Sequence, residues 1–174
     1  MIDNIIEAIA FAKIKHTGQK RKFTGEPYIH HPIRVATNAT VNNLPVEAIL
    51  AAYLHDTVED TNTTLDEVRE KFGDVVASLV AELTLDKSAY HDRESKTIYI
   101  TARVDAMSDV GFSIKLMDRL DNVTNLIEAP EKFAKKYYLE TSYIMDNITP
   151  RSELDVKLIN EIRACIQPVY EKYW

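Results

Sequence analysis

Apolar residues along the chain recur at the three- and four-residue spacing of amphipathic helices. Ile2, Ile5, Ile6 and Ile9 begin this pattern and predict a first helix that ends near His16. Only four glycines and six prolines occur, and they fall between the periodic segments. Strand-like alternation does not extend over any useful length. The pattern therefore predicts an all-α protein.

The later helices are expected between prolines and glycines. Pro32 and Pro45 each fall in a first turn, where the missing N–H costs least. Gly73 is expected to end one helix and Asp74 to cap the next. The polar residues 84–92 (TLDKSAYHD) are expected to be irregular. The predicted helices are 30–41, 45–58, 65–72, about 75–83, 93–107, 112–127, 131–147 and 152–171.

Composition narrows the class of protein. Hydrophobic residues make up 45% of the 174 and charged residues 28%, which is typical of a soluble globular protein with a core of its own. No apolar run approaches the roughly 20 residues that span a bilayer. The N-terminus lacks the basic start of a secretory signal, and Cys165 is the only cysteine. We therefore predict one domain over residues 1–174, located in the cytoplasm and without membrane attachment.

Charge is unevenly distributed along the chain. The net charge of −6 argues against a nucleic-acid binder. However, six basic residues and one acidic residue lie between Lys13 and Arg34. Such a local cationic patch on an acidic protein suits a small anionic ligand, although a solvated surface fits equally well.

Candidate metal ligands follow the apolar segment 48–54. In the sequence YLHDTVED, His55 and Asp56 are adjacent at the expected end of a helix. Imidazole and carboxylate together suit a borderline divalent ion. Adjacent helical residues point about 100° apart, so two more ligands must come from elsewhere. His31, in IHHP, and Asp118, in the apolar context KLMDRLDN, are the candidates.

Two more carboxylates follow the same pair. Glu59 and Asp60 each lie four residues after His55 and Asp56, and positions i and i+4 share a face of a helix. A metal that activates water beside a carboxylate that accepts its proton is the arrangement of a metallohydrolase. A solvated acidic helix end fits these residues equally well.

Longer motifs resemble a known family. The order His31, His55-Asp56, Asp118 resembles the HD superfamily of metal-dependent phosphohydrolases. Four segments resemble, more narrowly, the hydrolase domain of RelA/SpoT-type alarmone enzymes, over about residues 8–126. These segments are HTGQKRKFTGEPYIHHPIRVA (16–36), AAYLHDTVEDT (51–61), FGDVVASLV (72–80) and IKLMDRLDNV (114–123).

The resemblance implies a fold and a set of site residues. The fold would be a single helical HD bundle of about eight to ten helices, with a motif-bearing core at about 8–126 and C-terminal helices at about 131–171. One Mn²⁺ would be held by His31, His55, Asp56 and Asp118. Glu59 and Asp60 would help to activate water, and Asn122 would orient substrate or water. The substrate-binding candidates are Arg21, Lys22, Thr24, Tyr28 and Lys115.

The reaction implied by the resemblance is hydrolysis of the 3′-pyrophosphate of guanosine tetra- or pentaphosphate to GDP or GTP and pyrophosphate, by a stand-alone small alarmone hydrolase. Two departures bear on it. The loop RKFTGEP is one residue longer than the common RKSGEP form, and Asp121 and Thr124 replace a histidine and an arginine. An HD phosphohydrolase acting on another nucleotide or on a phosphorylated cofactor such as NADPH, and a non-catalytic nucleotide-binding module, are the alternatives.

Overall fold

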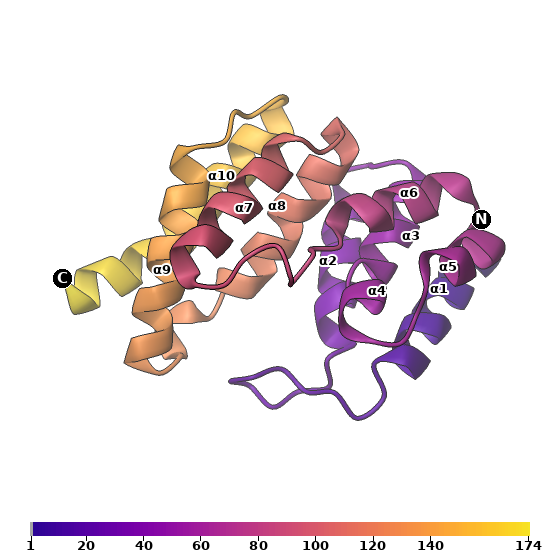
Figure 1. Cartoon of the computed structure of the whole chain (residues 1–174), viewed down its shortest axis with the longest axis horizontal. Helices are drawn as coiled ribbons and strands as arrows, with labels where there is room; N and C mark the ends of the chain where they lie inside the picture. The colour runs from indigo at the N-terminus through magenta and orange to yellow at the C-terminus, as the bar shows by residue number, and fades with distance from the viewer. Residues whose placement is uncertain (1) are drawn as a thin grey trace. The chain divides into compact units, whose positions relative to one another are not determined.

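The computed structural model describes residues 2–174, which form ten α-helices and one short 3-10 helix without any strand (Figure 1). The all-α prediction is therefore confirmed. Extended pairing in residues 2–174 is limited to an isolated bridge between Lys20 and Pro27. The helices are α1 (Ile2–Lys15), α2 (His30–Val41), α3 (Val46–Leu54), α4 (Thr57–Asp60), α5 (Leu65–Phe72), α6 (Asp74–Leu83), α7 (Arg93–Asp105), α8 (Asp109–Val123), η1 (Leu126–Glu128), α9 (Glu131–Asp146) and α10 (Glu153–Tyr173).

The helices group into two compact units along the chain. The first unit ends at Asp86 and contains α1 to α6; the second begins at Lys87 and contains α7 to α10 with η1. None of the helices in residues 2–174 combines the length and the apolar character that crossing a bilayer requires. The single domain over residues 1–174 stays a prediction.

Helix α3 is the centre of the first unit. All seven residues from Ala48 to Leu54 are buried, because the sequence AILAAYL is apolar on every face of a helix. Helices α1, α2 and α6 all pack against it. Ala48, Ala51 and Ala52 are fully buried, and small side chains at these positions allow neighbouring helices to approach closely. The helix that precedes His55 is thus fixed on all sides.

The predicted helix 45–58 is wrong at its C-terminal end, because α3 stops at Leu54 and a separate short helix, α4, begins at Thr57. Side chains cause the interruption. The His55 ring donates from Nδ1 to the carbonyl of Ala52, and the Thr57 hydroxyl donates to the carbonyl of Leu54. In an uninterrupted helix those carbonyls would accept from backbone amides four residues later.

The boundary between α5 and α6 lies at Gly73, as predicted. Gly73 has φ of 89°, a conformation that residues with a Cβ rarely adopt. Thr64 caps α5, and its hydroxyl accepts from the amide of Glu67 at 3.1 Å. Asp74, in contrast, is not the cap of α6: Gly73 occupies that position and Asp74 lies inside the first turn. A carboxylate there still suits the positive end of the helix dipole.

Helix α8 is the centre of the second unit and packs against α7 and α10 (Figure 1). It begins at Asp109, before the predicted start at residue 112, because Ser108 caps it by accepting from the amide of Gly111 at 3.1 Å. Gly111, which was expected to lie between helices, lies in the first turn of α8. Helix α8 ends at Val123, and η1 follows where the prediction continued the helix to 127.

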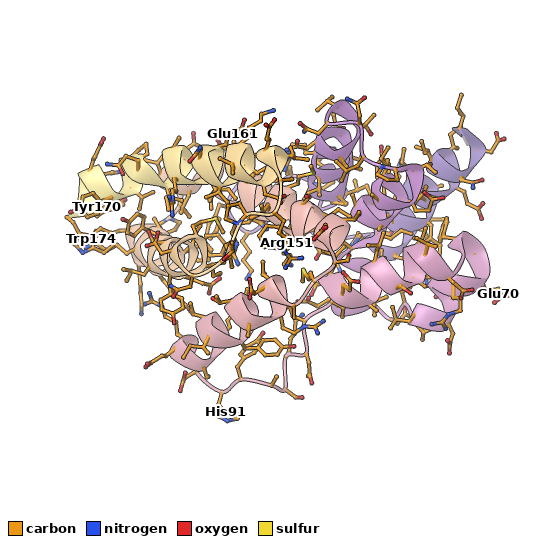
Figure 2. All side chains as sticks on the ribbon, turned by 90° about the horizontal axis from the view of Figure 1, so that it is seen from above. Glu70, His91, Arg151, Glu161, Tyr170 and Trp174 are labelled. Carbon is orange, nitrogen blue, oxygen red and sulfur yellow. The ribbon has the colours of Figure 1, made fainter. Side chains whose placement is uncertain are left out.

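The C-terminal end of α10 carries an aromatic cluster. Tyr170 and Trp174 lie close together there (Figure 2), with ring centroids 6.0 Å apart. Tyr138 of α9 lies 5.8 Å from Tyr170 and 5.2 Å from Trp174. These contacts fix α10 against α9 at this end of the second unit.

Candidate metal and phosphate site

His55 lies where α3 ends, and its orientation is fixed by the backbone. Its Nδ1 is 2.8 Å from the carbonyl oxygen of Ala52. A carbonyl oxygen can only accept, so Nδ1 carries the proton. In the neutral ring, Nε2 then presents a lone pair. A metal-binding histidine commonly has this arrangement, with the second nitrogen donating to a backbone carbonyl.

Asp56 brings together two histidines of the first unit, His31 and His55. Its Oδ2 lies 2.9 Å from Nε2 of His55 and 3.5 Å from Nε2 of His31. The rings of His31 and His55 meet edge to face with centroids 5.1 Å apart, and both histidines are at most 1% exposed. The first unit therefore assembles three of the four predicted metal ligands, from α2 and from the interruption after α3.

The electrostatics of this cluster favour the ionised carboxylate. Burial raises the pKa of Asp56, but the charges and hydrogen bonds of His55 and His31 outweigh it and hold that pKa well below its usual value. An imidazole nitrogen and a carboxylate oxygen at 2.9 Å need a positive charge between them, either a proton or a metal ion. The Asp56 carboxylate and the two imidazole nitrogens thus lie close enough together to face one cation.

Tyr28 completes the surroundings of Asp56. Its hydroxyl donates to Oδ2 at 2.6 Å. The centroid of its ring lies 4.8 Å from that of His16 and 5.7 Å from that of His31. The sequence placed Tyr28 among the substrate-binding residues, whereas in the structure its side chain contacts a predicted metal ligand and two histidines.

Sequence reasoning missed His16 and Gln19, both in the stretch HTGQ. His16 is buried, and its Nδ1 lies 2.7 Å from Oε1 of Gln19. The amide nitrogen of Gln19 donates to the backbone carbonyl of Asp60 at 2.9 Å. Gln19 thus ties the start of the basic loop to α4. The signal available in the sequence was the spacing of three residues between His16 and Gln19.

Glu59 and Asp60 lie in α4, one turn beyond the ligands. The Glu59 carboxylate accepts from the amide of Leu85 at 2.9 Å, so it also holds the backbone that follows α6. Asp60 is exposed, and its amide donates to the carbonyl of Asp56 at 2.9 Å. The local backbone therefore keeps the i, i+4 relationship between Asp56 and Asp60 although the helix is interrupted.

The basic loop is a small exposed hairpin. The amide of Arg21 donates to the carbonyl of Glu26 at 2.9 Å, and the Arg21 guanidinium lies 5.9 Å from the centre of the Tyr28 ring. Lys22 and Thr24 are exposed at the tip. The Glu26 carboxylate lies 2.8 Å from the guanidinium of Arg34, and this hydrogen bond lowers the pKa of Glu26.

The second unit holds the remaining predicted residues around Asp118. Its Oδ2 lies 2.9 Å from Nζ of Lys115, and its Oδ1 accepts from the amide of Asn122 at 2.6 Å. Lys115 and Asp118 are both less than a tenth exposed. The spacing of three and four residues places all three on one face of α8. Lys115 and Asn122 therefore fix the orientation of a buried carboxylate.

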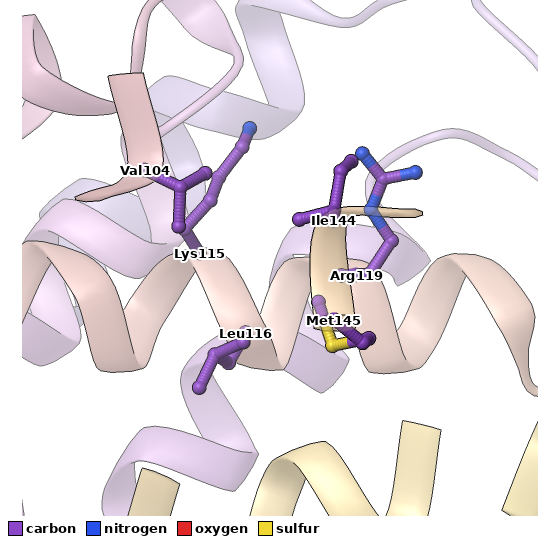
Figure 3. A pocket seen from close by; sticks show the side chains of 6 residues that line it. All are labelled: Val104, Lys115, Leu116, Arg119, Ile144 and Met145. Atoms are coloured by element: carbon purple, nitrogen blue, oxygen red, sulfur yellow. The ribbon is translucent and has the colours of Figure 1, made fainter. Parts of the chain in front are cut away.

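A second charged cluster lies beside this one. Arg119 and Lys96 contact the carboxylate of Glu140 at 3.0 and 3.1 Å, and Glu140 is 2% exposed. Burial raises the pKa of Glu140, but the two cations outweigh it and lower that pKa overall. Figure 3 shows a small pocket that Arg119 also lines. Lys115 and Arg119 both reach this pocket from α8. Its lining residues are Val104, Lys115, Leu116, Arg119, Ile144 and Met145.

Known proteins are similar to this chain in sequence. The family model described as "HD domain" matches residues 8–152. The chain is 43% identical over 143 residues to the guanosine-3′,5′-bis(diphosphate) 3′-pyrophosphohydrolase of Aquifex aeolicus, covering 82% of this chain but only 20% of that protein. It is 33% identical over 162 residues to the guanosine-3′,5′-bis(diphosphate) 3′-pyrophosphohydrolase MESH1 of Drosophila melanogaster, covering 88% and 89%.

A solved structure agrees with these relatives. It is described as a metazoan ortholog of SpoT that hydrolyses ppGpp and plays a role in starvation responses. It matches with a TM-score of 0.80 at 30% identity, over 92% of this chain and 94% of that one. The fold and the His/His/Asp cluster of the first unit define a helical protein with a divalent-metal site. The chain belongs to the HD-domain family, in its RelA/SpoT-type hydrolase branch.

Proposed function

We propose that this protein hydrolyses the 3′-pyrophosphate of guanosine tetra- and pentaphosphate, giving GDP or GTP and pyrophosphate, in a manganese-dependent reaction. The observation that carries the proposal is the fixed ring of His55, whose Nδ1 is 2.8 Å from the Ala52 carbonyl and whose Nε2 is 2.9 Å from Asp56. The choice of substrate rests on the names of the relatives.

The ligands in this proposal are His31, His55, Asp56 and Asp118, and they hold one ion. Two imidazoles with two carboxylates suit a borderline or hard divalent ion such as Mn²⁺. When bound, the ion supplies Lewis acidity toward water and toward phosphoryl oxygens. Asp118 enters through the family motif, and its burial between Lys115 and Asn122 in α8 supports its role, because these neighbours fix its carboxylate.

Glu59 and Asp60 accept and return the proton of the attacking water. Both carboxylates lie in α4, directly after Asp56. Asp60 is exposed, whereas the Glu59 carboxylate accepts from the amide of Leu85. A positioned general base contributes typically about 10²- to 10⁴-fold to the rate.

The phosphate groups are bound by cationic and hydroxyl side chains. Arg21, Lys22 and Thr24 present two charges and a hydroxyl from the exposed loop, and Lys115 contributes a charge from α8. Asn122 orients substrate or water. Neutralisation of phosphate charge is the main demand of phosphoryl transfer. The partner is a small nucleotide and not a nucleic acid, which agrees with the net charge of −6, and we place the reaction in the cytoplasm within a single HD domain.

A nucleotide panel tests the choice of substrate. Purified protein with Mn²⁺ would be incubated with guanosine tetraphosphate, GTP, a deoxynucleoside monophosphate and NADPH, and the products separated by ion exchange. We expect equimolar GDP and pyrophosphate from the tetraphosphate and little product from the others. Faster turnover of NADPH or of a monophosphate would keep the metal site and replace the substrate. Asp121 and Thr124 would then be the first residues to exchange, since they depart from the common motif.

A further inference from the structure

Tyr28 is the residue whose surroundings differ most from its expected role. Its hydroxyl lies 2.6 Å from the same Asp56 oxygen that both histidines approach. Its ring contacts the rings of both His16 and His31. A tyrosine that only lined a phosphate pocket would not need a hydrogen bond to the carboxylate of the ligand set.

We infer that Tyr28 is a positioning residue that orients the Asp56 carboxylate for the metal, and that it thereby connects the basic loop to the metal centre. The inference deepens the proposed function, since it rests on Asp56 being a ligand. The terminal torsion of an aspartate is broad, so its carboxylate rotates unless a neighbour holds it. The Tyr28 hydroxyl occupies one lone pair of Oδ2 and leaves the second one for a cation.

The loop is attached at both ends to the segment that carries the ligand. At its start, the side-chain amide of Gln19 donates to the backbone carbonyl of Asp60. At its end, Tyr28 donates to Asp56. The amide of Tyr28 also donates to the carbonyl of Gln19 at 3.0 Å, which closes the base of the hairpin. Arg21, beside the Tyr28 ring, is thus held near the ligand through one aromatic side chain.

The test is the affinity of the metal-free protein for Mn²⁺, measured by calorimetry. Tyr28→Phe removes the hydroxyl and keeps the ring contacts. We expect Mn²⁺ binding to weaken by about 10- to 100-fold, which is typical when the partner of a metal ligand is lost. Tyr143→Phe is the matched control, because Tyr143 lies on α9 with its side chain 45% exposed. Its Mn²⁺ affinity should equal that of the parent.

Unchanged Mn²⁺ affinity in a folded Tyr28→Phe protein would overturn the inference. If this variant fails to fold, the parent protein labelled with ¹³Cζ-tyrosine gives the answer. Binding of diamagnetic Zn²⁺ should shift the Tyr28 resonance and leave that of Tyr143 in place, and an unmoved Tyr28 resonance in zinc-loaded protein would contradict the inference. Both readouts report on metal binding alone. Their outcome is therefore independent of which nucleotide the substrate panel identifies.

Discussion

The imidazole of His55 donates from Nδ1 to the backbone carbonyl of Ala52, at 2.8 Å and within a single turn of the chain. This contact ends α3 and at the same time sets the tautomer of the ring. A buried, closely packed helix therefore leads directly into His55, whose second nitrogen lies 2.9 Å from Oδ2 of Asp56, where we propose that the cation binds. The stability of α3 and the geometry of the site have the same structural origin.

Removal of a ligand should abolish metal binding. His31→Ala and Asp56→Ala each delete a donor of the first unit, so we expect no Mn²⁺ binding and no hydrolysis, measured by calorimetry and by product analysis. His91→Ala is the control for the histidine, because His91 is exposed in the segment before α7. Near-normal turnover in both ligand variants would contradict the assignment of the metal site.

Replacement of Glu59 by glutamine tests the role of its carboxylate in proton transfer while keeping its structural contact. The amide oxygen of glutamine can still accept from the Leu85 amide, as the carboxylate does, so we expect the fold and the Mn²⁺ affinity to be kept. The rate should fall at least about 10²-fold if Glu59 handles the proton. Glu70→Gln, on the exposed face of α5, should turn over like the parent. A rate unchanged in Glu59→Gln would leave the role to Asp60.

The buried pair of Arg119 and Glu140 should dominate the stability of the second unit. Glu140→Gln leaves the Arg119 guanidinium buried without its counter-charge, which typically costs about 3–5 kcal/mol. Urea denaturation measures this loss. In the matched variant Glu161→Gln, an exposed pair with Lys157 at 4.0 Å is removed, and the free energy of unfolding should change by less than about 1 kcal/mol. Equal effects of the two variants would show that the buried pair is not stabilising.

Acid should remove the contribution of Glu140. Its pKa is lowered in the folded protein, because the attraction of Arg119 and Lys96 outweighs burial. Its stabilisation is therefore fully present above the pKa of glutamate in the unfolded chain, about 4.3, and is lost as the pH falls through the lower folded value. The difference in unfolding free energy between parent and Glu140→Gln should shrink as the pH is lowered from 6 toward 3. A difference that stays constant over this range would contradict the assignment.

Much of the fold follows from local patterns in the sequence. The apolar spacing of α1, the proline in the first turn of α2 and the glycine at residue 73 correctly placed helices in the first unit. The prediction failed where side chains override the pattern. His55 and Thr57 bond to backbone carbonyls and interrupt a helix that propensity would continue, and Ser108 caps α8 before a glycine that resembled a break.

The candidate site was predictable in its residue types and less so in its contacts. The charged residues of YLHDTVED pointed to metal chemistry, His31 and Asp118 were candidate ligands from their local sequence, and the family motif joined all four into one predicted ligand set. The contact of Tyr28 with Asp56 joins residues 28 positions apart, and no local periodicity encodes it. The same holds for Gln19 and Asp60, which lie 41 positions apart. Such contacts depend on how a loop closes over a helix end, which the sequence pattern alone does not determine.

The most direct test of the metallohydrolase is a titration of metal-stripped protein with Mn²⁺ while guanosine tetraphosphate is being consumed, with the products quantified after quenching in EDTA. We predict no turnover without metal, a rate that rises to saturation near one Mn²⁺ per chain, and equal amounts of GDP and pyrophosphate. Turnover that persists in the stripped protein and does not respond to added Mn²⁺ would contradict the account.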